Sequence, residues 1–292
     1  MEFNINTFEQ LHDICISKNK TIYEIAQENM ARQAEITVEE VRAFTNRSLF
    51  AMKEAIQAGL ASRELSMSGM CGQDCWNVQQ HFRHDRAIFG KTFEKIITYA
   101  LATSEENIRM GKIVACPTAG SCGIVPSALI AVSEDYDKSE REQINALITA
   151  GEIGRIISVK VALAGAVAGC QAECGAASAM SAGAICQLMG GNVSQVLNAM
   201  ALAMKNLLGL TCDPVAGLVE VPCVKRNPFM AVHSITAAEL ALAGVKSKIP
   251  PDEVIDAMEQ AGALMSPTLK ESSQAGLATT KTGLEVQKQV FG

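Results

Sequence analysis

The residues best suited to chemistry are two cysteines in the stretch GLTCDPVAGLVEVPCVKRNP, residues 209–228. Cys212 and Cys223 lie eleven positions apart, unlike the close pairs typical of structural zinc sites. Proline removes a backbone donor and restricts φ, so the stretch is not expected to form a regular helix. Its prolines are Pro214, Pro222 and Pro228. We therefore expect a stiff, irregular loop whose thiolates could bind a soft metal.

A metal bound by these two thiols needs a third ligand, and Cys170 is the best candidate. It lies in the segment AGCQAECG, where Gly169 and Gly175 leave room beside a helix. Three thiolates suit a soft ion or an iron–sulfur cluster, and a cluster held by only three leaves one iron open as a Lewis acid. The alternative is that the ten cysteines mainly serve as small buried side chains. We expect most of them to be packing residues and a few to be ligands.

A second stretch, GKIVACPTAGSCGIVPSALI at residues 111–130, could bind an anion. Pro117, Gly120 and Gly123 permit close approach of the backbone, and the apolar run after Cys122 is expected to begin a helix. The amides of such a loop at a helix N-terminus attract anions. The phosphate-binding patterns GxxxxGK[ST] and GxGxxG are absent, so the carboxylate of a small substrate is the better ligand.

Other thiol and imidazole side chains give weaker indications. Cys71 and Cys75 flank Asp74 in the loop-like segment 59–77. No second pair of matching spacing follows, so this segment suits the lining of a polar cleft better than a metal site. The histidines predicted to be surface or interior residues rather than ligands are His81, His84 and His233.

Helices must position these loops. Apolar residues recur at helical spacing through most of the chain. The predicted helical regions are 6–58 (three helices), 89–110, 143–204 (almost continuous, with its last helix over 193–208), 229–245 and 251–264. Thr37, with Glu40 three positions later, predicts the N-terminus of a long third helix. We expect an all-α fold, a multi-helix domain with Gly/Pro-rich active-site loops.

The domain organisation is expected to be simple. The acidic segment 131–142 is the best candidate for an exposed linker, but the pattern does not indicate two independent cores. We predict one domain over residues 1–292, with a helical part at 1–110 and a cluster- and substrate-binding part at 111–292. The tail after the last predicted helix is polar and contains glycine, so it is expected to be a covering loop or a flexible end.

Composition excludes several classes of protein. Hydrophobic residues make up 48% and aromatic residues 4%, which favours closely packed helices over a β-sandwich. A net charge of −6 gives no support for binding nucleic acid or an anionic membrane. The most membrane-like window, residues 161–188, is mostly Ala, Gly and Ser, so a buried helix pair is expected there. The N-terminus lacks a secretion-signal pattern, and a cytoplasmic protein is expected.

Three long motifs support a more specific hypothesis: PTAGSCGIVP, AGCQAECG, and LTCDPVAGLVEVPC followed by RNP. Together they resemble the alpha subunit of iron–sulfur-dependent L-serine dehydratase, also called L-serine ammonia-lyase. The resemblance covers essentially the whole chain and is strongest over 111–228. It implies a largely α-helical domain that binds a 4Fe-4S cluster.

The resemblance also implies site residues. The cluster ligands would be Cys170, Cys212 and Cys223. The loop that contributes to the L-serine pocket would be Pro117, Thr118, Ala119, Gly120, Ser121, Cys122 and Gly123. Cys122 is the alternative ligand, ranked second because its position between glycines suits the lining of the substrate site.

The implied reaction is a β-elimination. The hydroxyl of L-serine binds the open iron, a base removes the Cα proton, and hydrolysis of the product gives pyruvate and ammonia. The expected role is amino-acid degradation or gluconeogenesis, without pyridoxal phosphate. The alternatives are threonine or cysteine as substrate, or a non-catalytic helical scaffold with a metal or reactive thiols.

Two departures from the single-chain members of this family indicate a partner. Such relatives carry a beta-type domain with a Ser-Ser-His-Thr motif, and some end in a cysteine that reaches the cluster. The motif is absent from this sequence, which ends in Val290-Phe291-Gly292. The resemblance therefore implies a separate beta subunit in a hetero-oligomer. The catalytic base is not assignable to this chain.

Overall fold

The computed structural model describes residues 5–84, 88 and 90–292, and within these ranges the fold is all-α, as expected. Thirteen α-helices are present in these described ranges. No β-strand is formed there, and β-type pairing is limited to isolated bridges. The helices are α1 (Phe8–Lys18), α2 (Ile22–Gln33), α3 (Val38–Ala61), α4 (Asp74–Arg83), α5 (Lys91–Ile108), α6 (Ile124–Asp135), α7 (Glu140–Lys160), α8 (Gly165–Ala168), α9 (Ala176–Leu188), α10 (Val193–Lys205), α11 (Cys223–Leu242), α12 (Pro251–Leu264) and α13 (Lys281–Phe291).

The first three helices begin at capping boxes built from neighbouring residues. In each, a threonine precedes the helix and a glutamine or glutamate three positions later bonds back to it, which satisfies amides that have no helical partner. The pairs are Thr7 with Gln10, Thr21 with Glu24, and Thr37 with Glu40. The helix start predicted at Thr37 is confirmed. These helices therefore have their N-termini specified by sequence nearby.

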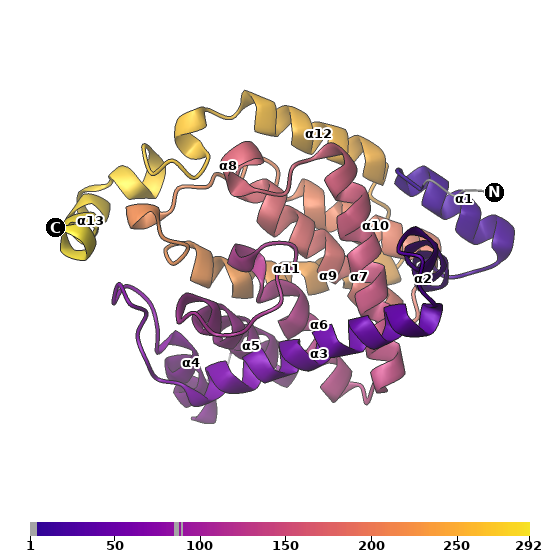
Figure 1. The fold of residues 1–292 in the computed structure, drawn as a ribbon, viewed down its shortest axis with the longest axis horizontal. Coiled ribbons are helices and arrows are strands. Elements are labelled where there is room, and N and C mark those ends of the chain that lie inside the picture. The colour runs from indigo at the N-terminus through magenta and orange to yellow at the C-terminus, as the bar shows by residue number, and fades with distance from the viewer. Residues whose placement is uncertain (1–4, 85–87, 89) are drawn as a thin grey trace.

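Helix α9 is the buried centre of the bundle and packs against α6, α7, α10 and α11 (Figure 1). Small side chains allow this close packing: a Cβ added to Gly183 would lie 2.2 Å from Cδ1 of Ile153 on α7. On the opposite side, the hydroxyls of Ser181 and Ser234 lie 2.8 Å apart and join α9 to α11. Among the described residues, no helix has the length and apolar composition needed to cross a membrane.

The stretch 209–228 was predicted to be irregular throughout, and this prediction was wrong for its second part. A 3-10 turn, η3 (Val215–Gly217), lies in the first part, but α11 begins at Cys223 and contains Pro228. Pro228 lies in the second turn of α11, where it removes a single helical hydrogen bond. In the first turn, Nδ2 of Asn227 donates to the carbonyl of Cys223 at 3.0 Å. Tertiary contacts thus allow α11 to begin at Cys223 although Pro228 disfavours a helix there.

Two other predicted boundaries differ from the structure. The supposed linker 131–142 begins inside α6, where Val132 is buried, so only a short connection reaches α7. The near-continuous helix predicted over 143–204 is interrupted after α7. There the chain forms α8, a π-helical turn η2 (Gln171–Gly175) and then α9. The apolar pattern did not reveal the break at η2 because most of its residues are buried, like those of α9 that follow.

The C-terminal part lies across one side of the bundle in Figure 1, with α12 along the bundle and α13 at the far end from the N-terminus. The bounds of α12, Pro251–Leu264, match the predicted range. After α12 the chain turns back over the loop that contains Cys212. One hydrophobic cluster includes residues from Phe8 on α1 to Met258 on α12. The division of the chain near residue 110 stays a prediction.

Candidate metal and substrate site

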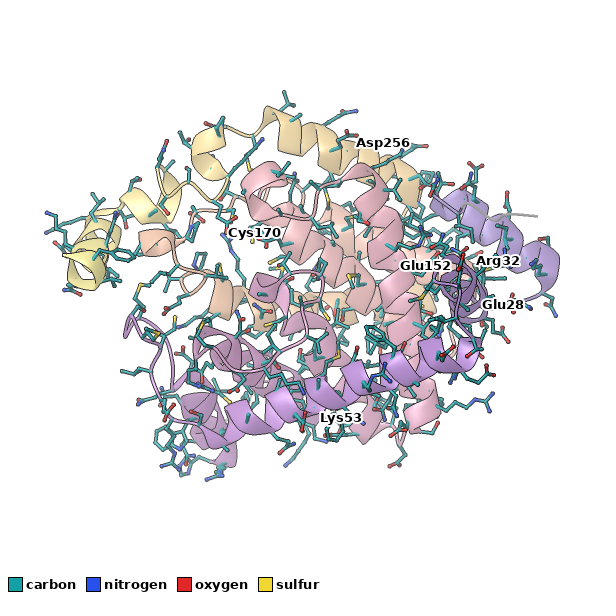
Figure 2. The ribbon with its side chains drawn as sticks, viewed as in Figure 1. Glu28, Arg32, Lys53, Glu152, Cys170 and Asp256 are labelled. Atoms are coloured by element: carbon teal, nitrogen blue, oxygen red, sulfur yellow. The ribbon has the colours of Figure 1, made fainter. Side chains whose placement is uncertain are left out.

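The structure brings together Cys170 and Cys212, two of the three predicted metal ligands. Their sulfur atoms and a carboxylate oxygen of Glu173 all lie within 4.8 Å of one another. Cys170 follows Gly169, whose φ of +77° is a conformation that favours glycine and that turns the chain out of α8. Figure 2 shows Cys170 near α8, on the opposite side of α7 from α2.

Cys212 is held in place by residues far along the chain. The amide of Cys212 donates to the carbonyl of Leu269 at 2.9 Å, and the carbonyl of Cys212 accepts from the amide of Glu271 at 2.7 Å. Next to it, the carboxylate of Asp213 accepts from the amide of Leu277 at 2.8 Å. We call residues 269–277 the C-terminal strap. The strap agrees with the predicted covering loop, whereas the end of the same tail forms helix α13 rather than a loop or flexible end.

Cys223, the third predicted ligand, is the first residue of α11 and is 8% exposed. Cys223 is not part of the group of ligand atoms within 4.8 Å. The structure therefore does not bring all three predicted ligands, Cys170, Cys212 and Cys223, within that distance of one another. Burial, and then the charge of Cys170, raise its pKa to about 12. That electrostatic influence indicates that Cys223 faces the same region as Cys170.

The thiol of Cys170 ionises more readily than its neighbours. Thiol hydrogen bonds from Cys174 and Cys212, together with the nearby guanidinium of Arg226, hold the pKa of Cys170 well below its usual value. Cys174 Sγ lies 3.5 Å from Cys170 Sγ, and the pKa values of Cys174 and Cys212 are raised because they act as donors to Cys170 and are buried. The guanidinium of Arg226 is thus available to balance negative charge on Cys170.

Arg226 is fixed by its own contacts. Its guanidinium donates to the carbonyl of Thr211 at 2.9 Å and to Asp213 at 3.3 Å. These bonds join the first turn of α11 to the residues on both sides of Cys212. A partly buried arginine in this position lowers the electrostatic cost of bringing thiolates together.

Glu173 is the member of the group that the sequence analysis missed. Burial, and then the negative charge of Cys170, raise its pKa to about 7, opposed by a hydrogen bond from the Thr118 side chain. Its sequence position held the relevant information: it lies three residues after Cys170, so one helical turn places both side chains on the same face. In the structure Glu173 lies in the π-helical turn η2, which Cys170 immediately precedes.

The predicted substrate loop, Pro117–Gly123, is clamped to α11 by the buried side chain of Asn227. Oδ1 of Asn227 accepts from the amide of Gly123 at 2.9 Å, and its Nδ2 donates to the carbonyl of Gly120 at 2.8 Å. Since Nδ2 also donates to Cys223, one amide connects the predicted substrate loop with the predicted ligand helix. The sequence analysis missed Asn227, although it lies in the RNP segment of the third motif.

The residues of this loop have different surroundings. Ser121 is buried and its hydroxyl donates to the carbonyl of Cys116 at 3.0 Å, whereas Ala119 is exposed. The thiol of Cys122 is fully buried and faces the carbonyl of Thr103 on α5, at 3.9 Å. Cys122 is not in the group with Cys170, and burial raises its pKa to about 12. Its environment is that of a packing residue.

The loop before α4 also contacts the stretch 209–228, in agreement with a role in lining a polar region. Glu220 accepts hydrogen bonds from the hydroxyls of Ser66 at 2.6 Å and Ser68 at 2.8 Å. Lys225 pairs with Asp74 at 2.6 Å and approaches Cys71 at 3.5 Å. Residues 220–227 thus contact three loops: the loop before α4, the loop Pro117–Gly123 and the loop that contains Cys212.

The histidines lie as predicted, whereas Cys75, expected in the lining of a polar cleft, is fully buried in a hydrophobic cluster. His81 and His84 are exposed, and His233 is satisfied by the carbonyl of Ala203 at 2.8 Å. Cys75 is buried against the carbonyl of Thr98.

A cavity of about 540 Å³ lies between α1, α2 and α10, lined by residues such as Asn19 and Val193. None of the clustered thiols lines it, so the chemistry and that cavity are separate.

Comparison with known proteins covers most of the chain. Residues 17–278 match the family described as the serine dehydratase alpha chain. A probable L-serine dehydratase alpha chain of Bacillus subtilis is 44% identical over 280 residues, which cover 95% of this chain and 93% of that protein. The L-serine dehydratase alpha chain of Peptoniphilus asaccharolyticus is 37% identical over 284 residues, 97% of each chain.

Some similar proteins are longer. An L-serine dehydratase of Escherichia coli is 41% identical over 186 residues, which cover 62% of this chain but only 40% of that protein. The similar region thus occurs both as a chain of about this length and as part of a larger polypeptide.

Proposed function

The chain belongs to the serine dehydratase alpha-chain family, and from that premise we propose that it is the alpha subunit of an iron–sulfur L-serine dehydratase. It converts L-serine to pyruvate and ammonia by β-elimination. The observation that carries the proposal is the group formed by the buried thiols of Cys170 and Cys212 and the half-buried carboxylate of Glu173, beside the loop Pro117–Gly123. A set of thiols next to a loop with free amides suits a small hydroxy-amino acid.

The donor set fits an iron–sulfur cluster. Cys170, Cys212 and Cys223 would hold a 4Fe-4S cluster, because soft thiolates are its preferred ligands and Arg226 offsets their charge. When bound, the cluster supplies a Lewis acid for the substrate hydroxyl at the iron that no cysteine holds. The other roles of the chain are to position the substrate and to exclude water from the thiols.

The substrate carboxylate is assigned to a narrower part of the loop than the sequence indicated. The amides of Ser121 and Cys122 donate to carbonyls within the loop, and that of Gly123 donates to Asn227. This leaves the amides of Ala119 and Gly120 as the donors for a carboxylate. Their orientation depends on Asn227, which holds the carbonyl of Gly120.

A separate beta subunit completes the enzyme in this proposal and supplies the base that removes the Cα proton. The alpha-chain names of the relatives and the greater length of the Escherichia coli relative support a second polypeptide or domain. The ten cysteines are all free, including the Cys170–Cys174 pair, which suits a reducing compartment such as the cytoplasm. A role in degradation of serine, and hence in carbon supply for gluconeogenesis, follows from the reaction.

The test is anaerobic purification with iron and sulfide analysis, followed by assays of serine turnover with and without the beta subunit. We expect a brown protein with about four irons per chain, in which turnover requires both subunits. Threonine and cysteine serve as alternative substrates in the same assay. A colourless protein that contains zinc and stays inactive with the beta subunit would show that the chain is a structural metal scaffold instead.

A further inference from the structure

Glu173 is the only oxygen donor in the group of three ligand atoms, and no sequence motif had assigned it a role. The inference below rests on the proposed function, because it concerns the metal centre that function requires. The carboxylate of Glu173 lies within 4.8 Å of the thiols of both Cys170 and Cys212. It is thus near enough to contribute a ligand atom to the same centre.

Two glycines show where the carboxylate points. A Cβ added to Gly165 would lie 2.6 Å from Oε2 of Glu173 and 2.9 Å from Sγ of Cys212, so both atoms face the space that this glycine leaves. On the other side, a Cβ added to Gly120 would lie 3.8 Å from Oε1 of Glu173. The carboxylate therefore lies between the thiols and the loop assigned to the substrate.

The surroundings of Glu173 differ from those of the buried carboxylates that make ion pairs, and from those of Glu220, which has two hydroxyl partners, Ser66 and Ser68. Glu152 is paired with Arg155 at 2.7 Å, and Asp213 with Arg226 at 3.3 Å. Within the described part of the chain, Glu173 makes no ion pair, and its side-chain partner is the hydroxyl of Thr118. A half-buried carboxylate with a single neutral partner still has acceptor capacity for a cation.

We propose that Glu173 is a fourth, exchangeable ligand of the metal centre, which occupies the position left free by the three cysteines until the substrate hydroxyl displaces it. A carboxylate suits this position because it is a harder and more weakly held donor to iron than a thiolate. Thr118 holds the carboxylate after it leaves, on the side of the substrate loop. The exchange involves only replacement of one oxygen donor by another, without oxidation or reduction.

Displacement makes a measurable prediction. Serine binds only to the fraction of centres from which Glu173 has dissociated, so the internal ligand weakens the apparent affinity for serine. The same ligand protects the exposed iron when serine is absent. Removing it should strengthen serine binding and make that iron easier to lose.

The experiment uses the full chain with its beta subunit, reconstituted with iron and sulfide without oxygen. Glu173→Gln and Glu173→Asp are compared with wild type and with Glu271→Gln, which removes an exposed carboxylate whose charge also reaches Glu173. Serine affinity is measured from the change in visible absorption, and iron lability from the rate at which mild oxidation yields a three-iron centre.

We expect Glu173→Gln to keep the iron content of wild type, to bind serine about tenfold more tightly and to lose one iron faster. Glu173→Asp should restore slow iron loss, and Glu271→Gln should match wild type. Unchanged serine affinity and unchanged iron loss in Glu173→Gln would overturn the proposal, even if turnover fell, since Glu173 would then act on the substrate. If wild type took up no cluster, the proposed function itself would fail.

Discussion

The helices α1–α3 and the first two turns of α11 obtain their hydrogen bonds in opposite ways. In α1–α3, the caps bond to residues three positions away, as Thr37 does with Glu40. In α11, Asn227 bonds to Gly120 and Gly123, more than a hundred positions earlier. The first region can form its helix ends alone, whereas the second has its shape only when other loops are in place. Local bonds support stability, and long-range bonds set the geometry of a site.

The cysteines of the two regions differ in the same way. Cys15 on α1 lies in the hydrophobic core, and burial raises its pKa to about 12. Cys170 is equally buried, but neighbouring thiols and Arg226 hold its pKa well below the usual value. Burial alone therefore does not mark a functional cysteine in this protein; the polar neighbours do.

Substitution of a cysteine in each region is expected to give the largest difference in cluster content and serine turnover. Cys212→Ser should abolish the bound cluster and lower serine turnover below detection, because it removes one of three soft ligands. Cys15→Ser should keep the cluster and lose only stability, as expected for a small buried side chain that becomes more polar. Iron analysis and thermal unfolding measure both variants. Full iron and full turnover in Cys212→Ser would break the comparison.

Two buried asparagines give the next effect. Asn227→Ala removes three hydrogen bonds, which we expect to cost about 2–3 kcal/mol and to lower kcat/KM for serine by about a hundredfold, because the substrate loop shifts. Asn29→Ala on α2 is the control: its Nδ2 has no acceptor among the described residues, so its effect should be smaller and leave kcat/KM unchanged. Urea unfolding and steady-state kinetics test the pair. Equal kinetic losses would mean that Asn227 has no specific role in positioning.

Two glycines in helices should respond in opposite directions. Gly165→Ala introduces a Cβ against Glu173 and Cys212, so it should lower cluster content and turnover by about tenfold with little change in unfolding temperature. Gly151→Ala on α7 meets no atom within 4 Å and should stabilise the protein by about 0.5–1 kcal/mol. Calorimetry and iron analysis measure the two changes. A normal cluster in Gly165→Ala would show that the site adapts easily.

The smallest effect concerns a cap in the first region. Hydrogen bonds from Thr21 lower the pKa of Glu24 in the folded protein, so the ionised form stabilises the fold above the unfolded-state pKa, and this contribution disappears as pH falls through the lower folded value. Thr21→Ala should therefore cost about 1 kcal/mol near neutral pH and less in acid, with serine turnover unchanged. Urea unfolding at several pH values measures it. A pH-independent cost would exclude Glu24 from the cap.

The sequence was sufficient where the structure depends on nearby residues. The bounds of α12 and the start of α3 followed from periodicity and capping alone. It was insufficient at Cys223, where Pro228 argued against a helix that Asn227 and its distant partners stabilise. Glu173 was missed although it lies three residues after Cys170, because its contacts with Cys212, Gly165 and Thr118 depend on the fold.

The C-terminal strap has a consequence for biosynthesis. The main chain of Cys212 bonds to Leu269 and Glu271, and the carboxylate of Asp213 accepts from Leu277. These three residues emerge from the ribosome after every helix from α1 to α12. The described geometry of Cys212 is therefore reached only after translation has passed residue 277. Metal loading would be a late event in the maturation of the polypeptide, following assembly of the helical bundle rather than nucleating it.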